Sequence, residues 1–300
     1  MPIAAPGRAR VWLLASRPAT LPAAAIPVVV GAAAALADGA ALRPLVFAVT
    51  LAAALLIQVA TNFANDYSDF HRGADHEGRL GPVRVTQSGL LSQDAVRLGI
   101  VVAFGLATLL GAWLVWVGGW PILAIGVFSI ICGLAYTGGP WPLGYHGLGD
   151  VFVFVFFGLI AVTGTAFLQL EHWSALALAV SVPVGLLVTN ILVVNNLRDL
   201  PTDPGAGKRT LAVRIGDRAT RVQYATQTLL AYAIPTVLAL MSAERRWLLL
   251  VWLSAPLALA NVRSIVGGLA GRELNPMLGR TGKLLVVFGA LLSVGLVLAR

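Results

Sequence analysis

The stretch LVFAVTLAAALLIQVATNFANDYSDFHRG, residues 45–73, decides the fold, because a long uncharged run passes directly into a cluster of Asn and Asp. About twenty apolar residues are needed to cross the hydrocarbon of a bilayer, where each segment must close its own backbone hydrogen bonds. The run lacks the alternation of polar and apolar residues that indicates a strand. The stretch therefore predicts a membrane helix that ends in polar side chains.

The rest of the chain has the same character. Hydrophobic residues make up 58% of the 300 residues and charged residues only 11%, with a mean hydropathy of +0.85. This balance excludes an ordinary soluble domain, and the absence of a linker or low-complexity tract predicts one all-α domain, residues 1–300. We expect a bundle of nine transmembrane helices around a central cavity. The nine apolar runs cover residues 19–37, 43–64, 96–117, 120–137, 150–170, 173–195, 223–241, 246–267 and 281–299.

The basic residues predict the orientation of this bundle. If residues 1–18 are cytoplasmic, 17 of the 21 Lys and Arg fall in cytoplasmic segments, which is the bias that membrane proteins show. We therefore expect an integral protein of a bacterial inner membrane, with its N-terminus inside and its C-terminus outside. The first run also suits a signal peptide, but eight further runs favour a membrane helix. The net charge of +8 suits anionic membrane lipid and an anionic substrate, whereas nucleic acid is disfavoured because no polar domain could read a groove.

Two of the longer inner segments, residues 65–95 and 196–222, resemble one another. Each carries an Asn/Asp cluster at the end of an apolar run, followed by basic residues. The two clusters are four runs apart, which suggests two pseudo-repeated halves facing one cavity. Within each cluster the helical spacing of three or four residues places the polar side chains on one face. The two faces comprise Gln58, Asn62, Asn65 and Asp69 in the first cluster, and Asn195, Asn196, Asp199 and Asp203 in the second.

Carboxylates near lipid are costly and should have partners. One alternative is structural pairing with Arg72 or Arg198. The other is a divalent cation, and ligands that are oxygen only suit Mg²⁺, which binds one or two carboxylates and completes its shell with water and substrate phosphates. Cys132 is the only cysteine and the four histidines are scattered, so neither a thiolate site nor a zinc spacing exists. Because the cluster occurs twice, the sequence favours metal-bound diphosphate.

Basic residues follow both clusters, as a diphosphate with its metals would require. We expect Arg84, in GPVRVTQSG, and Lys208, in GAGKRT, to contact the diphosphate, with Arg72 and Arg209 nearby. Neutralising the leaving group would allow an allylic C–O bond to ionise, and the resulting carbocation needs a dry site with aromatic faces. Tyr67 and Tyr136, next to the polar motifs, are the first aromatic candidates. Further aromatic candidates are Phe63, Phe152, Phe154, Phe156 and Phe157.

Four motifs together resemble the 1,4-dihydroxy-2-naphthoate polyprenyltransferases of the intramembrane aromatic prenyltransferase superfamily. They are SRPATLPAAAIPVVVG, NDYSD with its downstream Gly and Asp, YTGGPWPLGYHGLGDVFVFVFFG and NNLRDLPTD. The resemblance runs from about residue 11 to 299. It implies a cavity with a lateral opening to lipid, capped by the loops that carry the Asp motifs. It also implies Mg²⁺ as cofactor, with Mn²⁺ able to substitute.

Carried over position by position, the resemblance gives Asn65 and Asp69 to one magnesium ion, and Asn195, Asp199 and Asp203 to the other. Many members of the superfamily carry a third Asp where this chain has Gly73, and Asp75 stands two positions on as a replacement. Including the neighbouring positions, the predicted metal ligands are Asn65, Asp66, Asp69, Asp75, Asn195, Asn196, Asp199 and Asp203. The predicted catalytic residues are Asn65, Asp69, Asp199, Asp203 and Tyr136. The predicted substrate contacts are Arg17, Tyr67, Arg72, Arg84, Asp150, Lys208 and Arg209.

The implied reaction transfers a polyprenyl group from polyprenyl diphosphate to 1,4-dihydroxy-2-naphthoate, with loss of CO₂ and diphosphate, giving demethylmenaquinone for menaquinone synthesis. Asp150 and Tyr136 are expected to orient the acceptor. One alternative is a prenyltransferase with another aromatic acceptor or a phytyl donor. Another is a cation transporter, although both clusters stand at the ends of their helices rather than at the midplane where a transport site is expected.

Overall fold

The computed structural model describes residues 7–73 and 79–300, and the regular structure in this part of the chain is entirely helical. The α-helices are α1 (Arg8–Ala15), α2 (Pro22–Ala37), α3 (Pro44–His71), α4 (Gln93–Gly118), α5 (Trp120–Ala135), α6 (Gly149–Val153), α7 (Ala161–Leu170), α8 (Ala175–Asp199), α9 (Leu211–Met241), α10 (Ala255–Val266) and α11 (Asn275–Leu298). The 3₁₀-helices are η1 (Pro18–Thr20), η2 (Leu143–His146), η4 (Pro204–Ala206), η5 (Ala243–Ser254) and η6 (Gly271–Leu274), and η3 (Phe154–Ile160) is a π-helix. The predicted all-α class is confirmed.

Seven helical segments of the described chain are long and apolar enough to cross a membrane. Two of them are composite, because η3 joins α6 to α7 and η5 continues into α10. An eighth forms if α1 with η1 and α2 count as one span, bent by 54°, and α5 is a shorter apolar helix of 16 residues. The chain is therefore an integral membrane protein by the length and composition of its helices.

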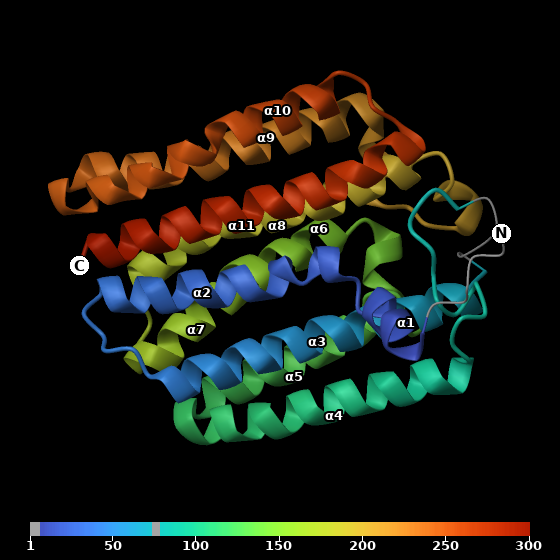
Figure 1. Ribbon diagram of the computed structural model, residues 1–300, viewed down its shortest axis with the longest axis horizontal. Helices are drawn as coiled ribbons and strands as arrows, with labels where there is room; N and C mark the ends of the chain where they lie inside the picture. Colours follow the sequence, from blue (N-terminus) through green and yellow to red (C-terminus); the bar gives the residue numbers. More distant parts are fainter. Residues whose placement is uncertain (1–6, 74–78) are drawn as a thin grey trace.

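Helix α8 forms the centre of the bundle and packs against α2, α9 and α11 (Figure 1). In its most apolar stretch 72% of the residues are buried, compared with 22% in the corresponding stretches of α3 and α4. Next to it, a Cβ atom at Gly158 of η3 would lie 2.5 Å from the Cα atom of Gly185 in α8. Glycine at these two positions thus allows the two backbones to touch, which closes the middle of the bundle.

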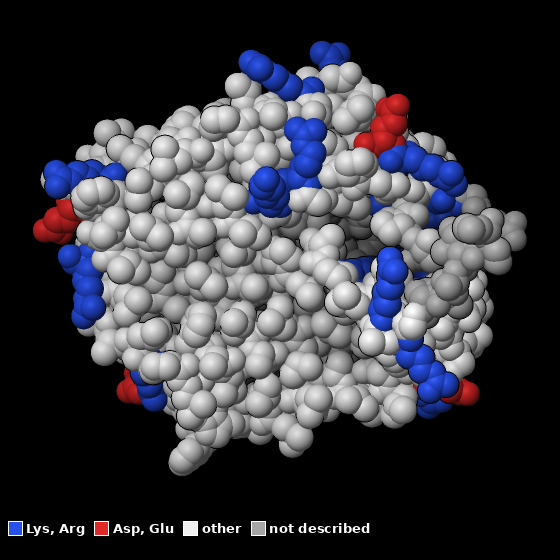
Figure 2. All heavy atoms as spheres, viewed as in Figure 1, with Lys and Arg blue, Asp and Glu red and all other residues white. Residues whose placement is uncertain are grey.

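The outer helices present hydrocarbon instead of charge. Leu109 and Trp116 of α4 are 70% and 83% exposed, as expected for side chains that face lipid. The space-filling view shows a broad face without charged side chains, with Lys and Arg gathered toward its margins (Figure 2).

Helices α3 and α8 extend further than the sequence predicted, to His71 and Asp199 instead of residues 64 and 195. Both Asn/Asp clusters consequently lie mainly on the last turns of helices and not in loops. Helix α9 begins at Leu211 and is interrupted at Gly216, whose φ of 81° is non-helical, so the predicted loop 196–222 is much shorter. The two helix ends meet at one end of the bundle, which we call the polar end (Figure 1).

Candidate active site

A cavity of about 100 Å³ lies at the polar end, and we call it the polar pocket. It is bordered by the last turns of α3 and α8, by the segment before α4, by the turn that contains η2, and by the turns around η4. The polar side chains that line it belong to Arg17, Asn65, Asp69, Arg79, Arg84, Tyr136, Thr137, Tyr145, Asn195, Asn196, Asp199, Thr202, Asp203, Lys208 and Thr210. Two clusters that are more than a hundred residues apart in sequence therefore face one space.

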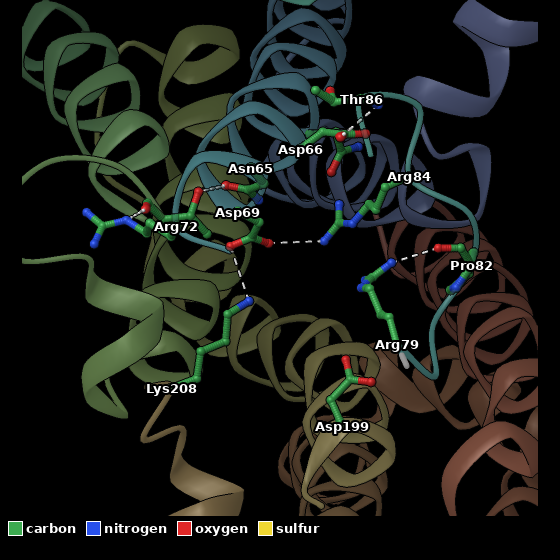
Figure 3. Close-up of polar contacts among 12 residues, drawn as sticks. Asn65, Asp66, Asp69, Arg72, Arg79, Pro82, Arg84, Thr86, Asp199 and Lys208 are labelled. Carbon is green, nitrogen blue, oxygen red and sulfur yellow. Dashed lines mark hydrogen bonds and ion pairs between the residues drawn. The ribbon is translucent and has the colours of Figure 1, made fainter. Parts of the chain in front are cut away.

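Asp69 is the hub of this pocket and is almost fully buried. Its Oδ1 atom accepts a hydrogen bond from the Tyr145 hydroxyl at 2.8 Å and lies 3.2 Å from the Lys208 ammonium. Its Oδ2 atom accepts a hydrogen bond from Arg84 Nη2 at 3.2 Å (Figure 3). One carboxylate thus ties together three segments that are far apart in sequence, and it holds two cations at the pocket wall.

Asn65 and Asp66 stabilise the walls around Asp69. The Thr137 hydroxyl donates to Asn65 Oδ1 at 2.8 Å. Asp66 accepts the backbone N–H groups of Val85 and Thr86 at 3.2 and 3.3 Å, so its carboxylate fixes the segment that carries Arg84 (Figure 3). Asp66 does not line the polar pocket, and this geometry gives it a supporting position.

On the opposite wall, Arg198 is completely buried and orients Asp199. Its Nε and Nη2 atoms donate to the two oxygens of the Asp199 carboxylate at 2.8 and 2.5 Å. Its Nη1 atom donates to Asn275 Oδ1 at 3.2 Å, which links α8 to α11. A bidentate contact of this kind fixes the orientation of the carboxylate group. The alternative of an ion pair with arginine thus holds for Asp199.

Asp203 lies in the turn after α8 and is buried. Burial and the neighbouring Asp199 carboxylate raise the pKa of Asp203 to about 7, although Lys208 and the Thr210 hydroxyl act in the opposite direction. Two carboxylates that face each other in a poorly solvated pocket favour a bound cation. The Lys208 ammonium does not neutralise the Asp203 carboxylate exclusively, because it also contacts Asp69 and lies 4.7 Å from the centre of the Tyr145 ring.

The donor set fits magnesium. Among the residues that the structure describes, no group of three His, Cys, Asp or Glu side chains is placed to hold a metal ion by itself. Mg²⁺ does not require such a cage, because it is usually held by one or two carboxylates together with substrate phosphates and water. The pocket offers carboxylate and amide oxygens from two walls, and cationic side chains for a diphosphate between them.

The structure brings most of the predicted site residues into the polar pocket, but not all of them. Tyr67, Arg72, Asp150 and Arg209 do not line it. Arg72 donates to the backbone carbonyls of Thr137 and Gly139. These contacts are hydrogen bonds to the backbone and differ from the ion pair with a carboxylate that was one predicted alternative. Asp150 is buried and accepts a hydrogen bond from Gln223 at 2.9 Å. Asp75 lies outside the described residues.

Sequence reasoning missed Tyr145 and Thr137 as pocket residues, whereas Arg79, one of the basic residues after the first cluster, does line the pocket. Tyr145 contributes both ends of its side chain, since its hydroxyl binds Asp69 and its ring lies beneath Lys208. The only sequence signal for it is its place in the glycine-rich YTGGPWPLGYHGLGD segment, and no spacing rule connects that segment to Asp69.

The polar pocket continues into an apolar cavity of about 240 Å³, which we call the middle chamber. Both cavities are lined by Arg17, Asn65, Tyr136, Leu192 and Asn195. Three of the predicted aromatic side chains, Phe152, Phe156 and Phe157, also line the middle chamber, whereas Phe63 and Phe154 do not. Arg17 stands at the junction with a φ of 51°, a left-handed backbone that is costly for a residue with a side chain and often marks a functional site.

Together these features define a class of protein, namely a helical membrane protein with a pocket of carboxylates and cations, suited to a metal and an anion, that opens into an apolar cavity. The sequence profile of the UbiA prenyltransferase family matches residues 24–269, and the chain belongs to this family. The predicted resemblance is thereby confirmed, and the family assignment decides against the transporter alternative.

Individual relatives agree with this assignment along nearly the whole chain. A Mycobacterium tuberculosis protein called 1,4-dihydroxy-2-naphthoate octaprenyltransferase is 42% identical over 278 residues, covering 92% of this chain and 93% of that protein. The Escherichia coli protein of the same name is 36% identical over 298 residues, covering 95% and 96%. A UbiA homologue from Archaeoglobus fulgidus, solved bound to GPP and Mg²⁺, has a TM-score of 0.68 at 16% identity, covering 96% of this chain and 99% of that one. The last similarity shows the shared fold.

Proposed function

We propose that this protein is a prenyltransferase that joins a polyprenyl group from polyprenyl diphosphate to 1,4-dihydroxy-2-naphthoate in menaquinone synthesis. The relatives that are 36–42% identical over nearly their full length carry the name of this activity. The observation that supports it most directly is the polar pocket itself, in which Asp69 faces Asp199 and Asp203 beside the entrance to the middle chamber. A diphosphate fits the charged part, and an isoprenoid tail fits the apolar part.

In this proposal Asn65, Asp69, Asn195, Asp199 and Asp203 hold divalent metal at the diphosphate. Mg²⁺ bound there supplies positive charge to the departing diphosphate, and Mn²⁺ can take its place. Arg84 and Lys208 contact the phosphate oxygens. Asp69 already holds both cations at the pocket wall, where they can reach a bound diphosphate. Tyr136 borders both cavities, so it is placed to orient the acceptor where the diphosphate meets the tail.

The bond changes balance without a dedicated base. The allylic C–O bond of the donor breaks and its electron pair leaves with diphosphate. The acceptor carbon that carries the carboxylate forms the new C–C bond, and CO₂ then leaves its electron pair to the ring, which restores aromaticity. The product of this step is the hydroquinone form of demethylmenaquinone, and its oxidation to the quinone is a separate reaction. Apolar walls protect the carbocation from water, and the aromatic faces of the middle chamber stabilise it.

An assay with purified protein tests this function. We expect prenylated product from 1,4-dihydroxy-2-naphthoate and a polyprenyl diphosphate, detected by mass spectrometry, only when Mg²⁺ or Mn²⁺ is present. Chelation should abolish turnover, and added Mg²⁺ should restore it. Turnover of 4-hydroxybenzoate in place of the naphthoate would reject the acceptor, and full activity after exhaustive chelation would reject the metal.

We also propose nine membrane crossings, with the N-terminus in the cytoplasm and the C-terminus outside. Seven segments, the bent pair of α1 and α2, and the shorter α5 supply nine. An odd number agrees with Figure 1, where α1 and the end of α11 lie at opposite ends of the bundle. Single cysteines introduced at Arg218 and at Arg300 of a Cys132→Ala protein test this arrangement. In intact cells, a membrane-impermeant maleimide should label only the residue-300 variant, and the reverse pattern would overturn the orientation.

A further inference from the structure

Asn275, the first residue of α11, makes two hydrogen bonds at the polar end that the chemistry described above does not use. Its Oδ1 atom accepts from Arg198 Nη1 at 3.2 Å, and its Nδ2 atom donates to the backbone carbonyl of Leu80 at 2.9 Å. Asn275 does not itself line the polar pocket. Any effect that it has on the site must therefore pass through these two partners.

The first partner leads to the wall of the pocket that carries Asp199. Arg198 is completely buried, and its Nε and Nη2 atoms donate to the two oxygens of the Asp199 carboxylate. The amide oxygen of Asn275 satisfies the remaining Nη1 donor without adding a second negative charge. The guanidinium is thus held at all three nitrogens, and its bidentate contact with Asp199 has no competing carboxylate at position 275.

The second partner belongs to residues 79–86, which we call the bridging segment. This segment supplies two cations, Arg79 and Arg84, to the polar pocket. Its C-terminal end is fixed to α3 by the backbone contacts of Asp66 (Figure 3). Its N-terminal end is fixed to α11 by the hydrogen bond to the Leu80 carbonyl. The bridging segment therefore connects the two walls of the pocket, and the amide at the start of α11 holds one of its ends.

Gly81 brings the bridging segment directly against the same guanidinium. A Cβ atom added at Gly81 would lie 2.8 Å from Arg198 Nη2 and 2.9 Å from Arg198 Cζ. Arg198 has little room to move away, because it is buried and held by Asp199 and Asn275. Glycine at this position thus lets the backbone pack on the guanidinium, within reach of the Asn275 amide.

We propose that Asn275 is a positioning residue, which fixes the Asp199 wall and the bridging segment relative to each other so that both can contact one metal-bound diphosphate. This inference deepens the proposed function and rests on it, because the fixed groups serve a diphosphate in the polar pocket. An amide suits the task, since it offers an acceptor to a cation and a donor to a carbonyl. Without it, the carboxylate and the arginines remain, but their spacing is no longer fixed.

Asn275→Ala tests the inference in purified protein. We expect the donor KM and the Mg²⁺ concentration for half-maximal rate to rise about tenfold, as when a group that orients metal ligands is removed. At saturating donor and Mg²⁺, kcat should fall by less than about threefold, because binding is affected more than the chemical step. The KM of the naphthoate should not change. Gly81→Ala, which displaces the bridging segment without altering Asn275, should give the same pattern.

The matched control is Asn261→Ala. Asn261 is a fully buried amide on α10 that donates to the Arg280 carbonyl at 3.2 Å, so it also ties a neighbouring helix to α11. It does not line the polar pocket and contacts neither Arg198 nor the bridging segment through this bond. Its removal should lower the Tm but leave the donor KM and the Mg²⁺ requirement unchanged.

Two further measurements do not depend on turnover. Hydrogen exchange of the bridging segment in the metal-free protein, followed by mass spectrometry, should be about tenfold faster in Asn275→Ala than in the unaltered protein or in Asn261→Ala. Binding of inorganic diphosphate in the presence of Mg²⁺, measured by calorimetry, should be about tenfold weaker in Asn275→Ala.

An unchanged donor KM and diphosphate affinity in a folded Asn275→Ala protein, or an equal change in Asn261→Ala, would overturn the inference. If Asn275→Ala does not fold, the same measurements on Gly81→Ala decide. Diphosphate binding by an unaltered protein that does not prenylate the naphthoate would instead reject the proposed function, and the weaker binding in Asn275→Ala would still support the positioning role.

Discussion

Replacing Asp69 with Asn is expected to lower turnover about a thousandfold while the protein still inserts and purifies in normal yield. The amide keeps the shape of the side chain but loses its charge and replaces one acceptor oxygen with a donor. Arg84 and Lys208 would lose the carboxylate that both contact, and the α3 wall of the pocket would lose the one carboxylate that lines the cavity among the described residues. Steady-state rates in proteoliposomes, with donor and Mg²⁺ in excess, measure the effect.

Two controls separate the charge of Asp69 from its other contacts. Tyr145→Phe removes one hydrogen bond to the same carboxylate at 2.8 Å and should cost about ten- to a hundredfold, since such bonds to charged groups are worth about 1.5–3 kcal/mol. Asp94→Asn, at an exposed position in the first turn of α4, should leave the rate within about twofold, because exposed charges contribute little. Near-normal turnover in Asp69→Asn would remove that residue from the proposed metal site.

The polar stripe on α3 could be predicted because it obeys helical periodicity. Gln58, Asn62, Asn65 and Asp69 are all buried, as side chains on an inward face should be. The structure divides this stripe into two functions. Gln58 and Asn62 line the middle chamber and donate to the Thr20 hydroxyl, whereas Asp69 lines the polar pocket. Spacing alone specifies the face but not where along it one cavity gives way to the next.

Asp203 was correctly predicted to lie beside Asp199, although the continuous helix assumed in that prediction ends before Asp203. Its spacing of four residues from Asp199 predicted one helical face, but α8 ends at Asp199, and Pro201 in the following turn lacks the N–H group that a helix interior needs. The Asp203 N–H nevertheless donates to the Asp199 carbonyl at 2.8 Å, as in one further α-helical turn, and this turn directs the side chain into the same pocket. Proximity in sequence placed this residue near its partner.

The contacts that sequence reasoning could not supply join segments without a shared period. Tyr145 meets Asp69 across 76 residues, and Asp66 meets the backbone of Val85 and Thr86 across an irregular segment. Asp66 stands only three residues before Asp69 on the same helix, yet its carboxylate holds backbone amides while that of Asp69 holds cations. The difference arises from the way residues 79–92 fold over the end of α3, for which neither composition nor spacing carries a signal.

The second large effect is expected from the opposite wall, where Asp203→Asn should lower turnover about a thousandfold and raise the Mg²⁺ concentration needed for half-maximal rate. Asp203 is the cleaner test on this wall, because Asp199 also neutralises the fully buried Arg198 and its loss would leave that charge unpaired. A magnesium titration at saturating donor measures both quantities. Asp94→Asn, at the exposed position in the first turn of α4, should leave the titration unchanged.

A double variant then tests whether the two walls act on one ligand. If Asp69 and Asp203 both serve a single metal-bound diphosphate, the first substitution already destroys the assembly, and the second adds little. We therefore expect the Asp69→Asn, Asp203→Asn protein to be about as slow as either single variant, within about tenfold. Independent sites would instead multiply their effects to about a millionfold. Multiplicative losses, together with an unchanged magnesium requirement in Asp203→Asn, would mean that the two carboxylates do not share a bound group.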